Sequence, residues 1–543
     1  MNRYLSVAAI LLWSVFARGA YAIDLLSPVA ADRLGVEEAW HRQIATVGGA
    51  ASIVDLQLWV QQNTLREFIE VVRADEAGKI IADGEVLRRI STDMKESSGL
   101  PIGKAEAERL ARLDVLKLKR RGIPAAIRSV SIKQVRLYLL GSDGGLSAYD
   151  AETGEVLWSL RIGEPELGYG RLGISDGYIT VINGTTMYRV IADDRKLANS
   201  TASGGRPIKP VVLDNVPLIG ATNTEHWVMI PDVRSGLESY SYEDIPGQPG
   251  FEIFSGQLMD KPTRFPGSSL ISFTTERGFF YVMDTREEPT TLFRLKTDGV
   301  SAGGATPASG DRFFLGSSAG RVYAIHATRA GEVLWNQSYA EPFYQAPFVA
   351  DERVLISSSF GNLHCIDASA GTPVWAAPSR YVESVFAKAA NLYFARSTVG
   401  LLVAIDPESG QQIKFGSDVF VERVVKNMDT DRLYLISHGG TIQCLRPQGA
   451  EQPTFLRDES AAAKSSKKDT ATATTEKKPT EDPFGAAAAG AAAAEPNADP
   501  FGAADPAAEP MADPFGGGAA GPFGADPFGG AGGGDAADDP FGG

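Results

Sequence analysis

Cysteine and histidine are scarce in this 543-residue chain, and their scarcity excludes several kinds of site. The two cysteines and five histidines are spread along the sequence, so no metal-ligand cluster of known spacing is present. A basic excess is also missing, because 52 Lys and Arg stand against 67 Asp and Glu, a net charge of −15. Proteins that follow nucleic-acid phosphates need the opposite balance, so nucleic acid is not an expected partner.

Long hydrophobic runs are absent too, since the stretch Leu5–Phe16 holds only twelve residues and a membrane span needs about 20. Arg3 precedes this stretch, and Ala20-Tyr21-Ala22 follows it with the small-x-small pattern of a cleavage site. The sequence therefore predicts a secretory signal peptide over residues 1–22. We expect an exported protein, periplasmic or extracellular, that is soluble after cleavage. The alternative for these residues is a membrane anchor. No cysteine near the cleavage site offers a point for lipid attachment.

A repeated unit of strand, turn and strand extends over residues 123–457. Residues 146–158, 322–335, 363–375 and 402–415 each combine a short apolar strand, a polar turn with glycine, and a strand that carries Trp or Phe. Another strand and a glycine hairpin precede each of them, and four further strand–glycine–strand units bring the total to eight. The hairpin glycines are Gly144, Gly184, Gly236, Gly278, Gly320, Gly361, Gly400 and Gly440.

The spacing of these glycines indicates the fold. The intervals are 40, 52, 42, 42, 41, 39 and 40 residues, and a period near 42 with several short strands is typical of a propeller blade. Glycine suits the hairpins because a tight turn requires a positive φ. We therefore predict an all-β domain, an eight-bladed β-propeller over residues 123–457, with seven blades as the alternative. We also expect Ala126–Ile132 to close the ring against the last blade near Thr441–Leu456.

Residues at fixed positions in the repeat are expected to be structural. An aspartate stands six residues after the hairpin glycine in four units, where a strand ends and its carboxylate can accept hydrogen bonds from turn N–H groups. A tryptophan recurs in the strand that follows, and we expect it to pack between blades rather than stack on a ligand. These residues are Asp150, Asp284, Asp367 and Asp406, and Trp158, Trp335 and Trp375.

The two cysteines fit the same register. Cys365 and Cys444 stand four residues after their hairpin glycines, where three other units have alanine. We therefore expect buried, structural thiols, because a reactive cysteine needs a nearby histidine or positive helix end. The two residues lie two blades apart, so a disulfide is not expected. The sequence predicts no catalytic, cofactor-binding or metal-binding residue.

The pattern Tyr-Ala-Ile-Asp-x-x-x-Gly-x-x-x-Trp, present in forms at 148–158, 323–335 and 364–375, resembles the pyrroloquinoline-quinone-type propeller repeat. That superfamily includes quinone-dependent dehydrogenases and non-catalytic propellers such as the outer-membrane assembly factor of bacterial envelopes. The quinone enzymes of that superfamily carry two adjacent cysteines, joined in a disulfide, and a calcium site. This chain has no adjacent cysteines. It also lacks the lipid-bearing N-terminal cysteine of the assembly factor.

Residues 23–122 do not follow the repeat. Strand candidates at Ser52–Gln61, Leu65–Arg73 and Lys79–Ala82 precede a helix that begins after Pro101 and ends at Gly122. We expect a small α+β module made of this sheet and helix. The basic residues near the helix end complement its dipole, and they are either solvated or in contact with an acidic partner.

The last 86 residues, 458–543, contain no Val, Ile, Leu, Trp or Tyr and hold 15 acidic against 5 basic residues. We expect this Ala/Gly/Pro-rich tail to be disordered, because it offers too little apolar surface to form a core. It nevertheless repeats Asp-Pro-Phe-Gly five times and Gly-Pro-Phe-Gly once. Six phenylalanines are therefore possible docking points for a partner, the alternative being a solvated spacer: Phe484, Phe501, Phe515, Phe523, Phe528 and Phe541.

Three functions remain open at this stage. The expected one is a non-catalytic, exported propeller scaffold for protein–protein interaction in the bacterial cell envelope. A quinone-dependent oxidoreductase and a carbohydrate-binding envelope component are the alternatives. No cofactor is expected, the partner proteins are unknown, and the sequence leaves the oligomeric state open.

Overall fold

The structure is a computed structural model, and it describes residues 25–44, 48–75, 79–80, 85–94, 101–192, 208–243, 249–416 and 418–457. All of these belong to one compact unit, residues 1–474. The expected signal peptide and the six tail phenylalanines lie outside the described residues. Those that are described are mostly β-strand, with the helices α2 (Pro28–Arg33) and α3 (Gly103–Arg120). None of the described helices is long and apolar enough to cross a membrane.

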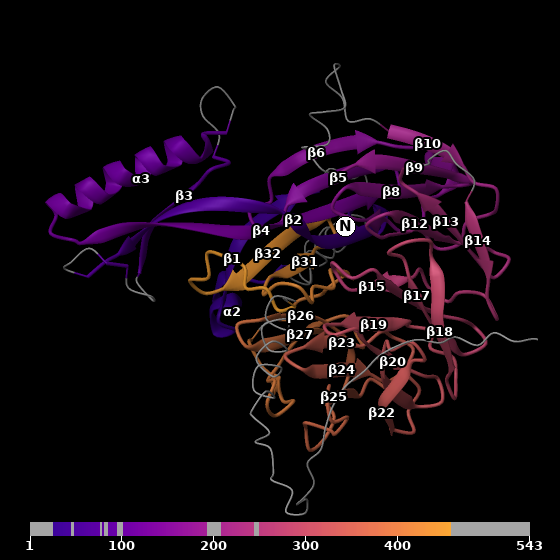
Figure 1. Cartoon of the computed structure of the whole chain (residues 1–543). Coiled ribbons are helices and arrows are strands. Elements are labelled where there is room, and N and C mark those ends of the chain that lie inside the picture. Colours follow the sequence, from indigo (N-terminus) through magenta and orange to yellow (C-terminus); the bar gives the residue numbers. More distant parts are fainter. Residues whose placement is uncertain are drawn as a thin grey trace, which may run out of the picture. The chain divides into compact units, whose positions relative to one another are not determined.

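The described residues form eight antiparallel sheets, which we number in chain order (Figure 1). Sheet 1 contains β2 (Ile53–Arg73), β4 (Ala125–Gly141), β5 (Gly145–Asp150) and β6 (Val156–Arg161), with β3 (Val86–Ser91) paired to the outer half of β2. Sheet 2 contains β7 (Gly173–Ile174), β8 (Tyr178–Asn183), β9 (Thr186–Ile191) and β10 (Ile208–Val212). Sheet 3 contains β11 (Thr222–Asn223), β12 (Trp227–Pro231), β13 (Gly236–Ser241) and β14 (Gly250–Ile253). Sheet 4 contains β15 (Thr263–Arg264), β16 (Leu270–Thr274), β17 (Phe279–Asp284) and β18 (Thr290–Lys296).

The second half of the chain continues the series. Sheet 5 contains β19 (Ala305–Ala308), β20 (Arg312–Gly316), β21 (Arg321–His326) and β22 (Glu332–Ser338). Sheet 6 contains β23 (Phe348–Ala350), β24 (Arg353–Ser357) and β25 (Leu363–Asp367). Sheet 7 contains β26 (Val382–Ala389), β27 (Leu392–Ser397), β28 (Leu402–Ile405) and β29 (Gln412–Ile413). Sheet 8 contains β30 (Arg423–Val424), β31 (Leu433–Ile436), β32 (Thr441–Pro447) and β1 (Val36–Gln43).

Neighbouring sheets share apolar cores, and these cores link the sheets into a closed cycle. One cluster of buried side chains joins each consecutive pair from sheets 1 and 2 to sheets 7 and 8. A further cluster joins sheet 8 back to sheet 1, for example through Tyr434 and Leu137. Alternate side chains of each strand serve the cores on its two sides, which is why the strands are apolar on both faces. This mostly β architecture of four-stranded antiparallel sheets agrees with the expected propeller.

Ring closure differs from the sequence expectation. The strand that pairs with β32 is β1, from Val36 opposite Pro447 to Gln43 opposite Thr441. Ala126–Ile132 instead pairs with the stretch from Arg66 to Val72 of β2. The expectation was wrong because the backbone groups of Ala126–Ile132 are already used in this long hairpin, and β1 covers the edge of β32. The expected boundary between residues 122 and 123 therefore lies between β2 and β4, which are neighbouring strands of sheet 1.

A tryptophan fastens one sheet to the turn of the next at three of the junctions. Nε1 of Trp335 donates to the carbonyl of Ala368 at 2.9 Å, and Nε1 of Trp375 donates to that of Pro407 at 2.7 Å. Trp40 of β1 makes the same contact across the closing junction, 3.0 Å from the carbonyl of Ala151. Each acceptor follows the aspartate that begins the turn. β1 therefore supplies to sheet 8 the tryptophan that sheets 5 and 6 carry in their own chain segments.

The aspartates hold the turns on which these indoles rest. Oδ1 of Asp367 accepts the N–H groups of Ser369 and Ala370 at 2.9 and 2.6 Å. Oδ1 of Asp150 and of Asp406 accepts two turn N–H groups in the same way. A glycine completes each turn, and a Cβ at Gly410 would stand 2.6 Å from Cδ2 of Trp375. The indole thus lies directly on the turn glycine.

Replacing Trp40 tests the closing junction. We expect Trp40→Ala to lower the free energy of unfolding by about 2–4 kcal/mol, because it removes indole packing and one hydrogen bond. Trp40→Phe keeps a ring but loses the donor, and should cost about 1 kcal/mol. Urea unfolding followed by circular dichroism measures both. An unchanged midpoint for Trp40→Ala would show that β1 does not hold the ring closed.

Two glycines with the same backbone conformation separate the turn contact from backbone strain. Gly410 and Gly310 have φ of +73° and +70°, but only Gly410 has an indole against its Cα; nothing lies within 4 Å of a Cβ at Gly310. Alanine at either position costs about 1 kcal/mol for the left-handed backbone. We expect Gly410→Ala to lower the thermal midpoint clearly more than Gly310→Ala, and equal shifts would contradict the docking role of the turn.

Candidate functional site

The repeat residues singled out in the sequence are distributed around the ring and do not meet at one place. The hairpin glycines lie at one end of the sheets, which we call the hairpin face, and the aspartate turns lie at the opposite end, the turn face. Seven hairpin glycines have φ between +58° and +89°. At the third unit Ser235 takes the positive φ of +61° in place of Gly236, where a Cβ would meet the Phe251 ring at 2.2 Å. Backbone N–H groups of Ser409 and Glu408 lower the pKa of Asp406, as expected for a turn residue.

Cys365 and Cys444 are buried in β25 and β32, with 2 % and 0 % of their surface exposed. Burial raises the pKa of Cys365 to about 12 and that of Cys444 well above its ordinary value. His364 contacts the Tyr339 ring, 4.4 Å away between centroids, and Nε2 lies 3.7 Å from the Glu341 carboxylate. Neither thiol is therefore activated.

A quinone and its calcium ion do not fit the residues present. The adjacent cysteines of such a site are missing, since the two cysteines lie in sheets 6 and 8. In the described part of the chain no group of three or more His, Cys, Asp or Glu side chains is placed to hold a metal ion.

The most distinctive feature of the turn face is an arm, residues 61–133, that leaves sheet 1 (Figure 1). β2 and β4 pair from Ile53 opposite Gly141 to Val60 opposite Val135 inside sheet 1, and again from Leu65 opposite Lys133 outward. The arm is thus inserted between the first two strands of sheet 1. Its sheet consists of the outer halves of β2 and β4 with β3, and α3 packs on it.

An aspartate of the neighbouring sheet fixes the point where the arm leaves the ring. The register of β2 and β4 shifts between Val60 and Leu65. Oδ2 of Asp176, which lies between β7 and β8, accepts the N–H groups of Gln62 and Asn63 at 2.8 Å each. Oδ1 accepts the indole N–H of Trp59 at 2.9 Å. These three hydrogen bonds tie the bulge to sheet 2 and set the direction of the arm.

A buried carboxylate ties the inner face of the arm to the end of the propeller chain. Glu70, 1 % exposed, accepts hydrogen bonds from Arg89 at 2.8 Å and Arg128 at 2.6 Å. Burial would raise the pKa of Glu70, but these hydrogen bonds outweigh it and lower the pKa below its ordinary value. Arg89 also pairs with Glu451 at 2.8 Å, and Gln452 donates to Glu70 at 3.2 Å. The arm is therefore braced against residues 451–452.

α3 covers the other face of the arm sheet with small side chains. Ala107 and Ala111 are fully buried against Ile69, Val71 and Ile90. Alanine at these positions lets the helix approach the sheet closely, and Leu110, Val115 and Leu118 pack beside them on the same core, while other large side chains point away. Those outward side chains include Leu113 and Leu116, which are 40 % and 55 % exposed.

After β32 the chain crosses the turn face of the ring. Leu456 donates its N–H to the carbonyl of Asp429 in sheet 8, and Arg457 pairs with the Asp429 carboxylate at 2.7 Å. The same guanidinium lies over the Phe265 ring, 5.3 Å from its centroid, and donates to the carbonyl of Pro307 at 3.3 Å. Phe265 follows β15 of sheet 4 and Pro307 is in β19 of sheet 5. One arginine thus connects sheet 8 with sheets 4 and 5.

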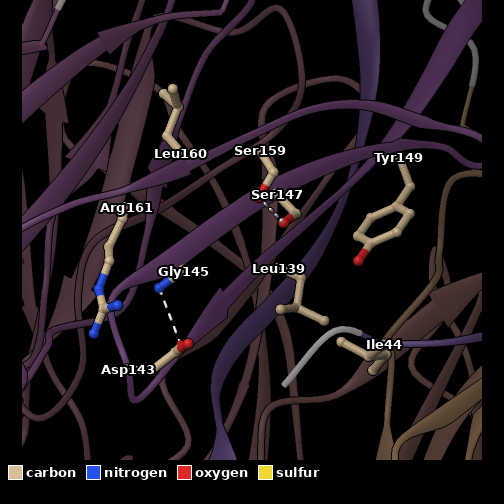
Figure 2. A pocket seen from close by; sticks show the side chains of 9 residues that line it. All are labelled: Ile44, Leu139, Asp143, Gly145, Ser147, Tyr149, Ser159, Leu160 and Arg161. Carbon is tan, nitrogen blue, oxygen red and sulfur yellow. Dashed lines mark hydrogen bonds between the residues drawn. The ribbon is translucent and has the colours of Figure 1, made fainter. Parts of the chain in front are cut away.

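A cavity of about 310 Å³ lies where the end of β1 meets sheet 1 (Figure 2). Its polar lining consists of hydroxyls and one pair of opposite charges, and Oγ of Ser147 and Ser159 are 2.9 Å apart. Burial raises the pKa of Tyr149, so its hydroxyl stays a donor at neutral pH. No histidine or cysteine lines it, so the cavity can bind a small polar molecule without offering an activated nucleophile. The lining residues are Ile44, Leu139, Asp143, Gly145, Ser147, Tyr149, Ser159, Leu160 and Arg161.

The sequence analysis did not predict that residues 25–60 contribute strands to the ring, β1 to sheet 8 and the inner part of β2 to sheet 1. The signal that could have found β1 is Trp40, because a tryptophan at the end of the unit marks three of the repeats, at Trp158, Trp335 and Trp375. The strand candidate Ser52–Gln61 is present as the inner part of β2, but it pairs with β4 in sheet 1 rather than forming a separate sheet. The helix expected after Pro101 is present as α3.

Comparison with known proteins supports the repeat assignment. A family profile described as "Outer membrane protein assembly factor BamB" matches residues 283–469. This match confirms the resemblance to pyrroloquinoline-quinone-type propeller repeats over that part of the chain. No curated protein matches the sequence.

Several solved structures are similar to this chain at low identity. BamB from Moraxella catarrhalis is 14 % identical with a TM-score of 0.42, over 58 % of this chain and 92 % of that one. The computationally designed Ika8 protein is 13 % identical with a TM-score of 0.42, over 57 % and 92 %. The dihydro-heme d1 dehydrogenase NirN in complex with DHE is 15 % identical with a TM-score of 0.37, over 51 % and 63 %.

The buried thiols give a direct test of the sheet register. At pH 8 we expect a maleimide to label Cys365 and Cys444 only slowly in the native protein and at once in urea, because burial keeps both thiols protonated and inaccessible. Mass spectrometry of the timed reaction gives the rate at each site. Rapid labelling of either cysteine in the folded protein would contradict its position between two sheets.

Proposed function

Residues 283–469 carry repeats of the pyrroloquinoline-quinone-type propeller family, and from this we propose that the chain is a non-catalytic scaffold for protein–protein interaction. In this proposal the eight sheets are the blades of one eight-bladed propeller. The protein is exported and acts in the cell envelope, in the periplasm or outside the cell. Support for the class of function comes from the family profile, which describes an outer-membrane assembly factor.

One observation carries the proposal, namely the arm inserted into sheet 1. A connection between two neighbouring antiparallel strands needs only a few residues. Here β2 and β4 instead extend beyond the ring, pair again from Leu65 opposite Lys133 outward, and carry α3. Asp176 and Glu70 fix the arm at two points, so its orientation is specified by buried polar contacts. A rigid element that leaves a closed ring suits recognition of another protein.

The polar groups of the described residues support a non-catalytic role. Both cysteines are buried and protonated, and the aspartates of the repeats are occupied by turn N–H groups. In the residues that the structure describes, the cavity of Figure 2 has no activated nucleophile among its lining side chains. The proposal therefore assigns the repeated geometry of the ring to support of the arm rather than to a reaction.

Removal of the arm tests the scaffold function. A variant in which Gly-Gly replaces residues 62–133 joins β2 to β4 at the turn face, where Gln61 and Gln134 adjoin the paired residues Val60 and Val135. We expect it to fold, with the strand signal of circular dichroism retained, because each ring core lies outside the arm. Affinity purification from envelope extract should then lose the proteins that the full chain recovers.

The comparison variant is truncated after Arg457, which removes the 86 residues of the tail, its six phenylalanines included, and leaves the arm in place. Equal recovery of the same proteins by the full chain and the arm-deleted variant would contradict an interaction through the arm. Quinone- and calcium-dependent oxidation of an alcohol or sugar by the purified chain would contradict the non-catalytic part of the proposal.

A further inference from the structure

We propose that the outward face of α3, which we call the α3 face, docks into an acidic groove with an apolar floor on a partner protein. The face consists of Leu113 and Leu116 with the basic residues Lys119, Arg120 and Arg121 at the helix end. This inference rests on the proposed scaffold function and specifies which surface of the arm makes the contact and which chemistry it recognises.

The apolar part of the α3 face has the spacing of a helix that enters a groove. Leu113 and Leu116 are three residues apart, so they stand side by side on one face of the helix. The helix already uses its opposite side, with Ala107 and Ala111, to pack on the arm sheet. Leucines that are 40 % and 55 % exposed are therefore not needed for the arm core. Paired apolar anchors of this spacing are the mode by which helices bind hydrophobic grooves.

The charges of the arm select an acidic partner. Residues 61–133 contain 15 Lys and Arg against 11 Asp and Glu, a net charge of +4 in a chain whose net charge is −15. Within α3, Arg109 pairs with Glu106 and Arg112 with Glu108. Lys117 pairs with Asp114 in the same way.

The positive charge that remains is concentrated at the helix end. Lys119, Arg120 and Arg121 form no ion pair within the described residues. They lie where the helix dipole is negative, so the helix itself offers them only a weak interaction. A carboxylate-rich rim around the groove would complement these three cations and would bring the protein together with its partner by electrostatic attraction.

An acidic protein fits this face better than an anionic membrane. Membrane-surface helices bury a broad apolar face, commonly with aromatic residues, into the lipid boundary. α3 presents only Leu113 and Leu116 outward, and its own apolar stripe is occupied by the arm sheet. Two leucines suit a shallow protein groove, so lipid binding becomes an outcome of the test.

Site-specific photocrosslinking tests the proposal on the full chain. A benzoylphenylalanine at position 116 is irradiated in envelope extract, and the crosslinked peptide is sequenced by mass spectrometry. The expected result is one dominant product with an acidic peptide. The same probe at position 399, which lies on the hairpin face, should give no such product. The triple variant Lys119→Glu, Arg120→Glu, Arg121→Glu should lower the yield of this crosslinked product at least tenfold. In a separate pull-down without the photoprobe, Leu113→Ser should lower recovery of the same partner severalfold.

Matched variants separate the α3 face from general surface effects. Lys209→Glu, Arg277→Glu and Arg329→Glu make the same change in charge on other sheets, and Val212→Ser removes an apolar side chain that is even more exposed, at 74 %. All of these should leave the yield unchanged. A crosslink that survives the triple charge reversal, or that is lost equally in the matched controls, would overturn the acidic-groove proposal.

The remaining outcomes distinguish this inference from the scaffold function. If the arm-deleted variant loses its partners but position 116 gives no crosslink, the arm binds through another face and the α3 proposal fails alone. If neither experiment shows a partner, the scaffold proposal fails with it. Sedimentation of the chain with phosphatidylglycerol vesicles that depends on Lys119, Arg120 and Arg121, without a protein crosslink, would replace the protein partner by a lipid surface.

Discussion

The indole that reaches from one sheet to the turn of the next is the contact on which the ring depends. At sheet 5 the indole comes from the outer strand, as Trp335 of β22, and at sheet 6 it comes from the segment that follows β25, as Trp375. The acceptor is always the carbonyl next to the turn aspartate, and the turn glycine lies under the ring. Because the aspartate fixes the turn and the glycine gives the indole room, all three residues must recur together. At these three junctions the recurring Asp, Gly and Trp of the sequence are the residues of one shared contact.

Sheet 8 has no outer strand of its own after β32, so the chain must bring one from elsewhere. β1 fills this place from the N-terminal side and carries Trp40 to the turn of sheet 1. The chain that leaves β1 then enters β2, so the first strand of sheet 1 also lies before the repeats of residues 123–457. The arm follows from this path, since the chain lies between the first and second strands of sheet 1 when it builds α3. Ring closure and the arm are thus parts of one arrangement of the N-terminal 133 residues.

The sequence allowed the sheets of residues 123–457 to be predicted because their signal is periodic and local. Positive φ at hairpins, aspartate at turns and tryptophan in outer strands each leave a residue of restricted type at a fixed position. The pairing of β1 with β32 joins residues about 400 positions apart, and no local pattern specifies such a partner. The α3 face was read as a helix end with basic residues, but exposure of Leu113 and Leu116 depends on which side of the helix the arm sheet covers. That choice is made by Ala107 and Ala111, and it became visible only in the packed structure.

The closing junction also carries a fully buried arginine, whereas Arg353 and Glu408 at the junction of sheets 6 and 7 form a more exposed ion pair. Arg432 of sheet 8 is fully buried and donates to Glu152 in the turn of sheet 1 and to Asp431, at 2.9 Å each. Burial raises the pKa of Glu152, while Arg432 opposes this change. A buried guanidinium without its partners is costly, so Arg432 is satisfied only when sheet 8 meets the Asp150 turn. The apolar cores are chemically alike and could pair sheets in other orders. We infer that this ionic contact makes the correct junction the favoured one, so that the two ends of a long repeat array meet each other rather than a second chain.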